Sequence, residues 1–406
     1  MQRRSRSDKI CCIALTVTCF LRGKCFINLP KRLKDALNNG LFRMPLSPDM
    51  IELLARARGD LRMGLPIVLV DDGQVSLAAS AETVSDHRLA EMRALAQATV
   101  LTVTARRAET LKARAYDGDV ARIIPPADAD ARWFASAANP AEDLNAPMKG
   151  PMQTERDGSA DLHRMAITLA KASRLLPAMV VSDLGHIGAL QVDHNLTVIN
   201  ALHAKAILNT RSALKDIVSA RLPMEVSETG RLHVFRPEDG GEEHYAIEIG
   251  RPDRSKPVLA RLHSACFTGD LLGSLKCDCG PQLRGALAQM GAEGAGVLLY
   301  LNQEGRGIGL ANKMRAYSLQ DQGFDTVEAN HRLGFEDDER DFRLGSDILK
   351  SLGFTAVRLL TNNPAKIDIM ERNGVSVEER VPLKVGETTH NRAYLATKAR
   401  KSGHML

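Results

Sequence analysis

The chain has 406 residues, of which 44% are hydrophobic and 25% are charged, and its formal net charge at pH 7 is +5. This length is enough for two domains with separate cores, and the composition is ordinary for a globular protein. Aromatic residues make up only 4% of the chain and are not interleaved with basic runs, so nothing suggests stacking on nucleic-acid bases. The mild positive charge suits a small anionic substrate, and we expect no nucleic-acid partner.

The first 46 residues differ from the rest. A basic start, Met1-Gln-Arg-Arg4, precedes an apolar run from Ile10 to Leu21 that is too short to span a bilayer. Arg22-Gly-Lys24 stands where a secretory signal would have small residues at its cleavage site. We therefore expect residues 1–46 to be a disordered or non-native extension, and the protein to be cytoplasmic with no membrane partner.

Residues 47–220 form a first predicted domain, which is rich in alanine and alternates apolar stretches with turn signals. Pro66–Val70 and Val100–Thr104 have the character of buried strands. Asp86–Leu95 and Leu162–Leu175 have the apolar spacing of helices. No repeat of fixed period occurs, so we expect a single domain of mixed helices and strands.

Residues 221–396 form a second predicted domain, in which strands alternate with helices. The expected strands are Val258–His263, Val297–Leu301 and Ala356–Leu360, and the expected helices are Gln282–Met290, Leu310–Gln322, Ser346–Leu352 and Pro364–Arg372. Such alternation is typical of α/β domains, in which loops at strand ends carry function. We therefore predict an α/β (mixed α+β) protein of two domains, followed by a basic tail at residues 397–406.

Three cysteines, Cys266, Cys277 and Cys279, lie close together in a polar loop of the second domain. Zinc prefers thiolate ligands; a catalytic zinc has three protein ligands and an open position for water, whereas a structural zinc is closed by four. No cysteine follows Cys279, so the count favours an open metal site and a hydrolase. Two alternatives remain open: a structural site closed by His263, and buried thiols that hold no metal.

Two further segments of the second domain carry groups that can bind phosphate. Glu304 and Arg306 lie in the glycine-rich segment 303–309, between a predicted strand and a predicted helix. Glycine lets the backbone approach a ligand closely, and arginine can grip phosphate through two parallel hydrogen bonds. The segment Thr361–Lys366 predicts a helix start, and helix N-termini hold anions. Each segment alone is also consistent with an ordinary turn or helix cap.

A charged run at residues 337–341 is, by charge alone, typical of a solvated helix face. Its neighbours change that interpretation, because the same domain holds the cysteine loop and both candidate anion sites. A metal site, an anion site and acid–base groups are what metal-assisted hydrolysis of a phosphorylated substrate requires. We therefore predict this class of reaction for the second domain.

With these motifs, the sequence from about residue 222 to 395 resembles GTP cyclohydrolase II, the entry enzyme of riboflavin biosynthesis. The motifs that carry the resemblance are Arg261-Leu-His-Ser-x-Cys266, Ser274-Leu-Lys-Cys-Asp-Cys-Gly280, Gln303-Glu-Gly-Arg306, Ile308-Gly-Leu310, Leu319-Gln-Asp-Gln-Gly323, Asp325-Thr-Val-Glu-Ala-Asn-His331, Asp338-Glu-Arg-Asp341 and Leu359-Leu-Thr-Asn-Asn-Pro364. The resemblance implies a cyclohydrolase fold with a zinc loop, about one Zn²⁺ per chain, Mg²⁺ with the GTP phosphates, and a homodimer. It also implies hydrolysis of GTP to 2,5-diamino-6-hydroxy-4-(5-phosphoribosylamino)pyrimidine, formate and pyrophosphate.

The resemblance assigns roles residue by residue. The family's zinc ligands match Cys266, Cys277 and Cys279. Asp338 matches a proposed proton acceptor, Arg340 matches a residue proposed as nucleophile towards the α-phosphate, and Tyr317 matches an active-site tyrosine. Arginine is a poor nucleophile, so charge stabilisation at the phosphate is an equal alternative for Arg340. The positions that match substrate-binding residues are Arg261, Leu262, His263, Ser264, Ala265, Gln282, Glu304, Gly305, Arg306, Thr326, Thr361 and Lys366.

Two positions depart from the family pattern. Ala265 stands where many relatives carry glutamate, directly before the first expected zinc ligand, so any contact made by that carboxylate is missing. Gly307 replaces a larger polar residue of some members. Neither change removes an expected metal ligand or catalytic group, so the resemblance implies an active enzyme.

Residues 47–220 resemble, more faintly, 3,4-dihydroxy-2-butanone-4-phosphate synthase, which precedes the cyclohydrolase in two-domain riboflavin enzymes. The likeness lies in Pro66-Ile-Val-Leu-Val-Asp-Asp72 and Ala78-Ala-Ser-Ala-Glu82. The synthase holds magnesium with an acidic cluster between these pieces, whereas Gly73-Gln-Val-Ser-Leu77 has no carboxylate and suits a hard cation poorly. We interpret this domain as a degenerate, silent synthase. The alternatives are a bifunctional enzyme and a non-catalytic GTP-binding regulator.

Overall fold

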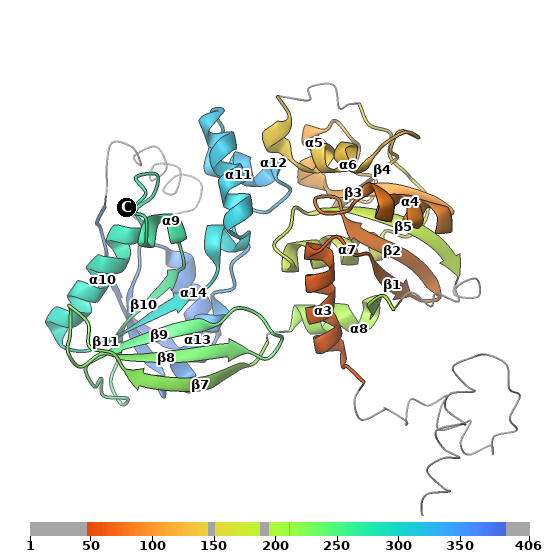
Figure 1. Cartoon of the computed structure of the whole chain (residues 1–406). Coiled ribbons are helices and arrows are strands. Elements are labelled where there is room, and N and C mark those ends of the chain that lie inside the picture. Colours follow the sequence, from red (N-terminus) through yellow and green to blue (C-terminus); the bar gives the residue numbers. More distant parts are fainter. Residues whose placement is uncertain (1–46, 145–150, 187–194, 211, 387–406) are drawn as a thin grey trace, which may run out of the picture. The chain divides into compact units, whose positions relative to one another are not determined.

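The computed structural model describes residues 47–144, 151–186, 195–210 and 212–386. Asp49–Leu406 form one compact unit, which contains two β-sheets (Figure 1). The predictions made for residues 1–46 and 397–406 lie outside the described residues. Within the described ranges, no helix combines the length and the apolar character needed to cross a membrane.

The first half of the described chain is built on a six-stranded sheet. Its elements are α3 (Met50–Arg62), β1 (Ile67–Asp71), β2 (Gln74–Ser80), α4 (Asp86–Leu95), β3 (Ala98–Thr104), α5 (Ala105–Thr110), β4 (Val120–Ile123), α6 (Ala131–Ala138), η1 (Pro140–Glu142), α7 (Asp161–Ala172), β5 (Ala178–His186), β6 (Val198–Asn200) and α8 (Ala201–Asn209). The strand order is β4-β3-β5-β2-β1-β6. Strands β1 and β6 are parallel, and the other neighbours are antiparallel.

Both faces of this sheet are buried, as strand β1 illustrates. Its side chains alternate between the two faces. Ile67 packs in a cluster with Leu61 of α3 and Met165 of α7, whereas Val68 packs in a second cluster with Leu89 of α4 and Phe134 of α6. This explains why the strand reads as a continuous apolar run in the sequence.

Helix α7 carries a group that links stability to pH. The Nδ1 atom of His163 lies 2.7 Å from the Thr102 hydroxyl, and burial lowers the pKa of His163 from 6.5 to about 4. Between these two values the unfolded chain binds a proton that the folded chain excludes. The free energy of unfolding should therefore fall as the pH falls through this window, by about 3 kcal/mol at most. We expect His163→Gln to flatten this dependence in urea denaturation; an unchanged slope would contradict the assignment.

The second half is built on a seven-stranded sheet. Its elements are β7 (Leu214–Arg221), β8 (Arg231–Pro237), β9 (His244–Ile249), β10 (Val258–Ser264), α9 (Phe267–Asp270), α10 (Cys279–Glu293), β11 (Gly296–Leu301), η3 (Glu304–Gly307), α11 (Leu310–Asp321), α12 (Thr326–Arg332), α13 (Arg343–Ser351), β12 (Ala356–Leu360), α14 (Pro364–Arg372) and β13 (Ser376–Val381). The strand order is β13-β12-β10-β11-β9-β8-β7. The first four strands of this order are parallel, and an antiparallel meander extends them.

Helices cover both faces of the parallel part of this sheet. Ala260 of β10 packs in a cluster with Ile348 of α13, while its neighbour Leu259 packs with Met290 of α10 on the opposite face. This arrangement of buried strands between helices confirms the predicted mixed α/β class. Strands β7, β8, β9 and β13 and helices α9 and α12 were not predicted. Strand β7 is hydrogen-bonded to β8, and all of its residues but the last come before residue 221, where we placed the start of the second domain.

Candidate active site

Three loops meet at one edge of the second sheet. Strand β10 pairs in parallel with both β11 and β12, so the loops after these strands leave the sheet on the same side. They are the cysteine loop (residues 265–279), the glycine-rich loop (residues 303–309) and the turn that begins α14. Together with helix α11 they line a cavity of about 340 Å³.

The cavity gathers almost every residue that the sequence singled out. The predicted residues that line it are Arg261, Leu262, His263, Ser264, Ala265, Cys266, Cys277, Cys279, Gln282, Glu304, Gly305, Arg306, Tyr317, Thr326, Asp338, Arg340 and Lys366. Thr361 is the exception. Its hydroxyl accepts a hydrogen bond from the Asn363 amide at 3.0 Å and is buried beneath the start of α14.

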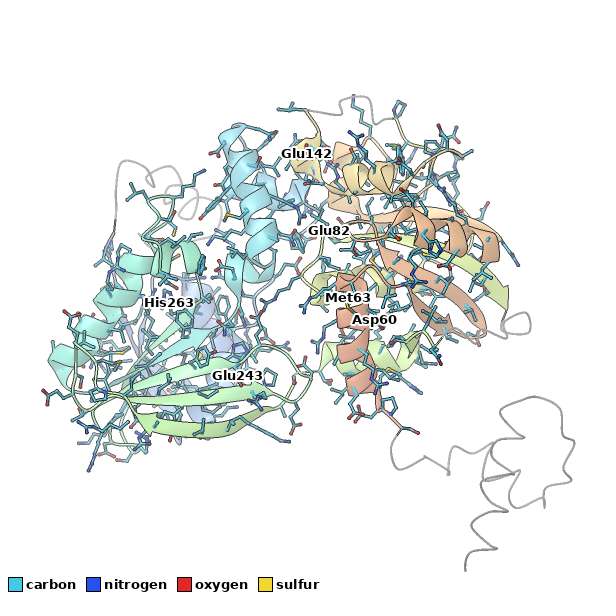
Figure 2. The ribbon with its side chains drawn as sticks, viewed as in Figure 1. Asp60, Met63, Glu82, Glu142, Glu243 and His263 are labelled. Atoms are coloured by element: carbon cyan, nitrogen blue, oxygen red, sulfur yellow. The ribbon has the colours of Figure 1, made fainter. Side chains whose placement is uncertain are left out.

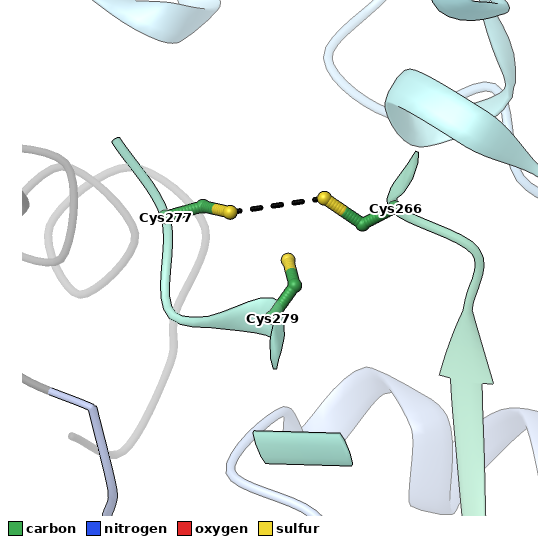
Figure 3. A group of neighbouring side chains, drawn as sticks. All are labelled: Cys266, Cys277 and Cys279. Atoms are coloured by element: carbon green, nitrogen blue, oxygen red, sulfur yellow. Dashed lines mark hydrogen bonds between the residues drawn. The ribbon is translucent and has the colours of Figure 1, made fainter. Parts of the chain in front are cut away.

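The three cysteine thiols converge beside this cavity (Figure 3). Their sulfur atoms all lie within 4.8 Å of one another, and Sγ of Cys266 is 3.7 Å from Sγ of Cys277. Gly269 leaves the room that they need, because a Cβ atom there would stand 2.7 Å from the Cys277 sulfur and 3.1 Å from the Cys266 sulfur. The cluster therefore fits a thiophilic metal ion such as zinc.

The thiols are arranged so that one of them carries the negative charge. Hydrogen bonds from Cys277 and Cys279, together with the nearby Lys313 ammonium, hold the pKa of Cys266 well below the ordinary thiol value. The hydrogen bond to Cys266 raises the pKa of Cys277 in turn. A thiolate is the form that binds metals, so the lowered pKa of Cys266 favours metal binding.

Lys313 of α11 is a buried cation that the sequence reasoning missed. Its ammonium lies 3.1 Å from the Cys266 sulfur and 2.8 Å from the Glu304 carboxylate. Glu304 in turn accepts a hydrogen bond from the Phe267 amide in the cysteine loop. Burial lowers the pKa of Lys313, but the hydrogen bond to Glu304 and the neighbouring negative charges outweigh it, and the net shift is upward. Lys313 therefore ties the cysteine loop to the glycine-rich loop.

Removing this ammonium should be costly, because it would leave a buried carboxylate and a thiolate without a counter-charge. We expect Lys313→Met to lower the free energy of unfolding of the metal-free protein by about 3 kcal/mol, measured by urea denaturation with a chelator present. Lys276→Met is the matched control, since the Lys276–Asp321 pair is exposed and such pairs contribute about 1 kcal/mol or less. Equal effects from both substitutions would contradict this role for Lys313.

The glycine-rich loop has the backbone conformation that only a glycine run allows easily. Gly305, Gly307 and Gly309 all have positive φ angles, and Arg306 between them has a φ of 61°, a value that costs energy for a residue with a side chain. A Cβ at position 307 would stand 2.7 Å from the carbonyl oxygen of Glu339. The larger residue of some family members would therefore not fit here without movement of the segment that follows α12.

Asp338 and Arg340 lie in that segment and face each other. The Arg340 guanidinium donates to both carboxylate oxygens of Asp338, at 2.8 Å and 2.5 Å, and its third nitrogen lies 3.4 Å from the Ser264 hydroxyl. Burial raises the pKa of Asp338, but the bonds from Arg340 outweigh this effect and keep the pKa below its usual value. At neutral pH the pair is an ionised carboxylate beside a fixed cation, in a loop rather than on the solvated helix face that charge alone suggested.

Two buried polar atoms in the cavity wall have no hydrogen-bond partner among the described residues. They are Nε of Arg261 and Oε1 of Gln303. Burial lowers the pKa of Arg261 to about 10, with Cys279 and Asp278 partly opposing the shift, so the side chain remains a cation at neutral pH. Buried polar groups without partners are rare in proteins. Nε of Arg261 is a donor that suits an anionic or carbonyl oxygen of a ligand, and Oε1 of Gln303 is an acceptor that suits an N–H or O–H group.

His263 does not close the cysteine cluster. Its Nε2 atom lies 3.0 Å from both carboxylate oxygens of Asp270, and its ring stacks on Tyr300; Figure 2 labels His263 near the end of β10. The group of potential ligand atoms found among the described residues contains the three cysteines without His263. Asp270 also accepts a hydrogen bond from the Cys266 amide at 2.9 Å. The alternative of a structural site closed by His263 is therefore not supported.

Helix α11 contributes three other lining residues, which the sequence reasoning missed. They lie on the same face of the helix as Tyr317. Lys313, Ala316, Tyr317 and Gln320 all line the cavity, at the i, i+3, i+4 and i+7 spacing of one helix face. Burial raises the pKa of Tyr317 to about 12, so its hydroxyl is protonated at neutral pH. A helical projection from Tyr317 could have found Lys313 and Gln320 from the sequence.

Comparisons with known proteins place the chain in a family. Residues 215–382 match the family model described as GTP cyclohydrolase II. A protein named GTP cyclohydrolase-2 from Azospirillum brasilense is 42% identical over 370 residues, covering 89% of this chain and 96% of the relative. Shorter proteins of the same name match too: that of Azotobacter vinelandii is 58% identical over 43% of this chain and 84% of its own length, and that of Shigella dysenteriae is 54% identical over 48% of this chain and 98% of its own.

Solved structures give weaker likenesses. A two-domain 3,4-dihydroxy-2-butanone 4-phosphate synthase from A. baumannii covers 82% of this chain and 99% of its own, at 18% identity and a TM-score of 0.31. The synthase of the same name from Candida albicans covers 38% of this chain, at 17% identity and a TM-score of 0.30. At these scores neither likeness carries an argument. The match to the relative from Azospirillum brasilense, which spans almost the whole of both chains, does carry one. It shows that the chain belongs to the GTP cyclohydrolase II family and is an enzyme of that type.

Proposed function

We propose that the chain hydrolyses GTP to 2,5-diamino-6-hydroxy-4-(5-phosphoribosylamino)pyrimidine, formate and pyrophosphate, the first step of riboflavin biosynthesis. The observation that carries the proposal is the meeting of the three thiols with the Asp338–Arg340 pair at one cavity. The three thiols suit a metal that activates water, and the Asp338–Arg340 pair suits a phosphate. A substrate hydrolysed both at its base and at its triphosphate needs both.

Cys266, Cys277 and Cys279 would hold a single zinc ion in this proposal, and bound zinc supplies activated water near neutral pH. The residues around it define where the base of GTP can lie. Glu304 and Tyr317 line the cavity beside the thiols and offer an acceptor and a protonated hydroxyl. They would orient the guanine so that its C8 atom faces the three thiols, where a bound zinc would supply the water for ring opening and release of formate.

Arg340 would act on the triphosphate as a fixed positive charge. Its guanidinium donates two hydrogen bonds to the Asp338 carboxylate, an arrangement that favours a stable cation over a deprotonated nucleophile. The charge would stabilise the α-phosphate as water displaces pyrophosphate, and Asp338 would accept the proton of that water. Arg306 and Lys366 line the same cavity and would bind the phosphates.

Magnesium would enter with GTP in this account. The described residues hold no group of three carboxylate or imidazole ligands around a common point; the one metal-binding group found among them is the cysteine cluster. A cation bound mainly by substrate phosphates and water needs few protein ligands. The homodimer implied by the family is likewise a proposal.

We propose that the first half of the chain lacks synthase activity. Strand β1 ends at Asp71 and β2 begins at Gln74, and the two pair directly across the Asp72-Gly73 turn. This tight hairpin leaves no loop for the acidic cluster on which the synthase relies, and it supports the silent-domain interpretation over the bifunctional alternative.

The test of the proposed function is an assay of the zinc-loaded protein with GTP and Mg²⁺. Formate and pyrophosphate should appear in equal amounts. Binding of GTP that stays intact, measured by equilibrium dialysis, would instead favour a binding protein. Formation of 3,4-dihydroxy-2-butanone 4-phosphate from a sugar phosphate in a parallel sample would support the bifunctional alternative.

A further inference from the structure

The first half of the chain contacts the segment that carries Asp338 and Arg340. The ammonium of Lys171, near the end of α7, lies 2.6 Å from the carboxylate of Glu339, the residue between the two proposed catalytic groups. The same carboxylate oxygen accepts a hydrogen bond from the Glu336 amide at 3.0 Å. Both side chains of the ion pair are about three-quarters buried, with 26% and 24% of their surface exposed, so solvent screens it only partly.

The turn after α7 contacts the glycine-rich loop as well. Arg174 donates to the carbonyl oxygen of Asn302, just before the loop, at 3.1 Å. Its own carbonyl accepts a hydrogen bond at 3.1 Å from the side chain of Asn312, which is fully buried and also bonds the carbonyl of Ile308. Arg174 thus contacts a residue on each side of the loop, Asn302 before it and Asn312 after it.

The two halves also share a core. Leu333 and Phe335, which lead into the segment 336–341, pack in one cluster with Ala108 and Phe134 of the first half. Between them, the carbonyl of Gly334 accepts a buried hydrogen bond from the Thr104 hydroxyl. Glu82, labelled in Figure 2, adds an ion pair with Arg315 of α11 at 2.7 Å.

Segment 336–341 needs such contacts, because it contains no helix or strand. From the second half it receives hydrogen bonds at its backbone: the Glu339 amide donates to the Arg306 carbonyl at 3.0 Å, the Arg306 guanidinium to the Asp337 carbonyl at 3.2 Å, and the Gln303 side chain to the Asp341 carbonyl at 2.7 Å. His331 contacts the Asp337 carboxylate, and Arg340 contacts the Ser264 hydroxyl. The bond from Lys171 adds a contact at the Glu339 side chain, and each further contact reduces the number of conformations that an irregular segment can sample. A displacement of about 1 Å in a catalytic group can lower a rate roughly 10²-fold.

We propose that the first half of the chain is a positioning element for the active site, and that Lys171, through Glu339, holds Asp338 and Arg340 in their working arrangement. This inference rests on the proposed function for its kinetic consequence, but the ordering of the segment does not depend on it. Lys171 and Glu339 are positioning residues, since neither lines the cavity.

The test is a double-mutant cycle with Lys171→Met and Glu339→Gln in the full-length, zinc-loaded protein. Each single change should lower kcat for formate release about tenfold, with a smaller change in KM and an unchanged zinc content. The double variant should be no worse than either single one, because both remove the same contact. The charge swap Lys171→Glu with Glu339→Lys should recover part of kcat. Lys205→Met, at an exposed lysine of α8, is the matched control and should leave kcat unchanged.

A second measurement separates this inference from the proposed function. Amide hydrogen exchange of the peptide that contains residues 336–341 should become faster in Lys171→Met than in the wild type, whether or not the protein releases formate. Should Lys171→Met fold poorly, Glu339→Gln in the loop serves for the same comparison. Unchanged exchange in this peptide, or additive effects of the two substitutions on kcat, would overturn the positioning role. Faster exchange without any formate release in the wild type would uphold the contact and refute the proposed function.

Discussion

Replacing Cys277 with serine should remove zinc from the protein and abolish formate release from GTP. The three sulfur atoms lie within 4.8 Å of one another, so loss of one leaves two thiols, too few to hold the ion tightly in a site that also keeps a position for water. The rate should fall by roughly 10³-fold or more, because a catalytic metal contributes several kcal/mol to the transition state. Metal analysis and a formate assay on the same sample measure both effects.

Leu275→Ser is the matched control for this variant. It places a serine in the same loop at a position that is 56% exposed and removes no thiol. Zinc content and turnover should both stay close to the wild-type values. A Cys277→Ser variant that keeps its zinc and its turnover would contradict the account of the cysteine cluster.

The second large effect is expected at Arg340. Arg340→Ala should lower kcat for pyrophosphate release by roughly 10²- to 10³-fold, the usual loss when one charge-stabilising group is removed. Arg340→Lys should keep part of the activity, because the charge remains while the paired hydrogen bonds to Asp338 are lost. Steady-state kinetics with GTP measures both variants.

The choice between the two roles of Arg340 needs a separate observation. If the guanidinium acts only as a charge, wild-type enzyme quenched with denaturant at alkaline pH, where a P–N bond survives, should carry no covalently bound nucleotide in intact-mass analysis. A guanylyl adduct mapped to Arg340 would contradict the charge role and support the nucleophile.

Much of the second half of the fold could be predicted because its elements are separated by strong local signals. The bounds of β12 follow from an apolar run. Those of α14 follow from an asparagine cap and a proline at the first helical position, and the Asn363 side chain does accept a hydrogen bond from the Ala365 amide. Strand β7 could not be predicted in this way. Seven of its eight residues are exposed, so it shows no alternation of apolar and polar residues.

The candidate site was predictable where residues are adjacent in sequence and less so where the fold brings them together. The cysteine loop and the Asp338–Arg340 pair are short motifs, and the resemblance to a family supplied their roles. Thr361 matched a substrate-binding position of the family, yet its hydroxyl accepts a hydrogen bond from the Asn363 amide at the start of α14. Lys171 and Glu339 are 168 positions apart, and no spacing rule connects them.

The most direct test of the central claim is to follow GTP labelled with ¹³C at C8 by NMR in the presence of the zinc-loaded enzyme and Mg²⁺. The account predicts that the label leaves the base and appears as formate, in step with the release of pyrophosphate. GTP that stays intact while bound, or that loses phosphate while the label remains in the purine, would contradict it.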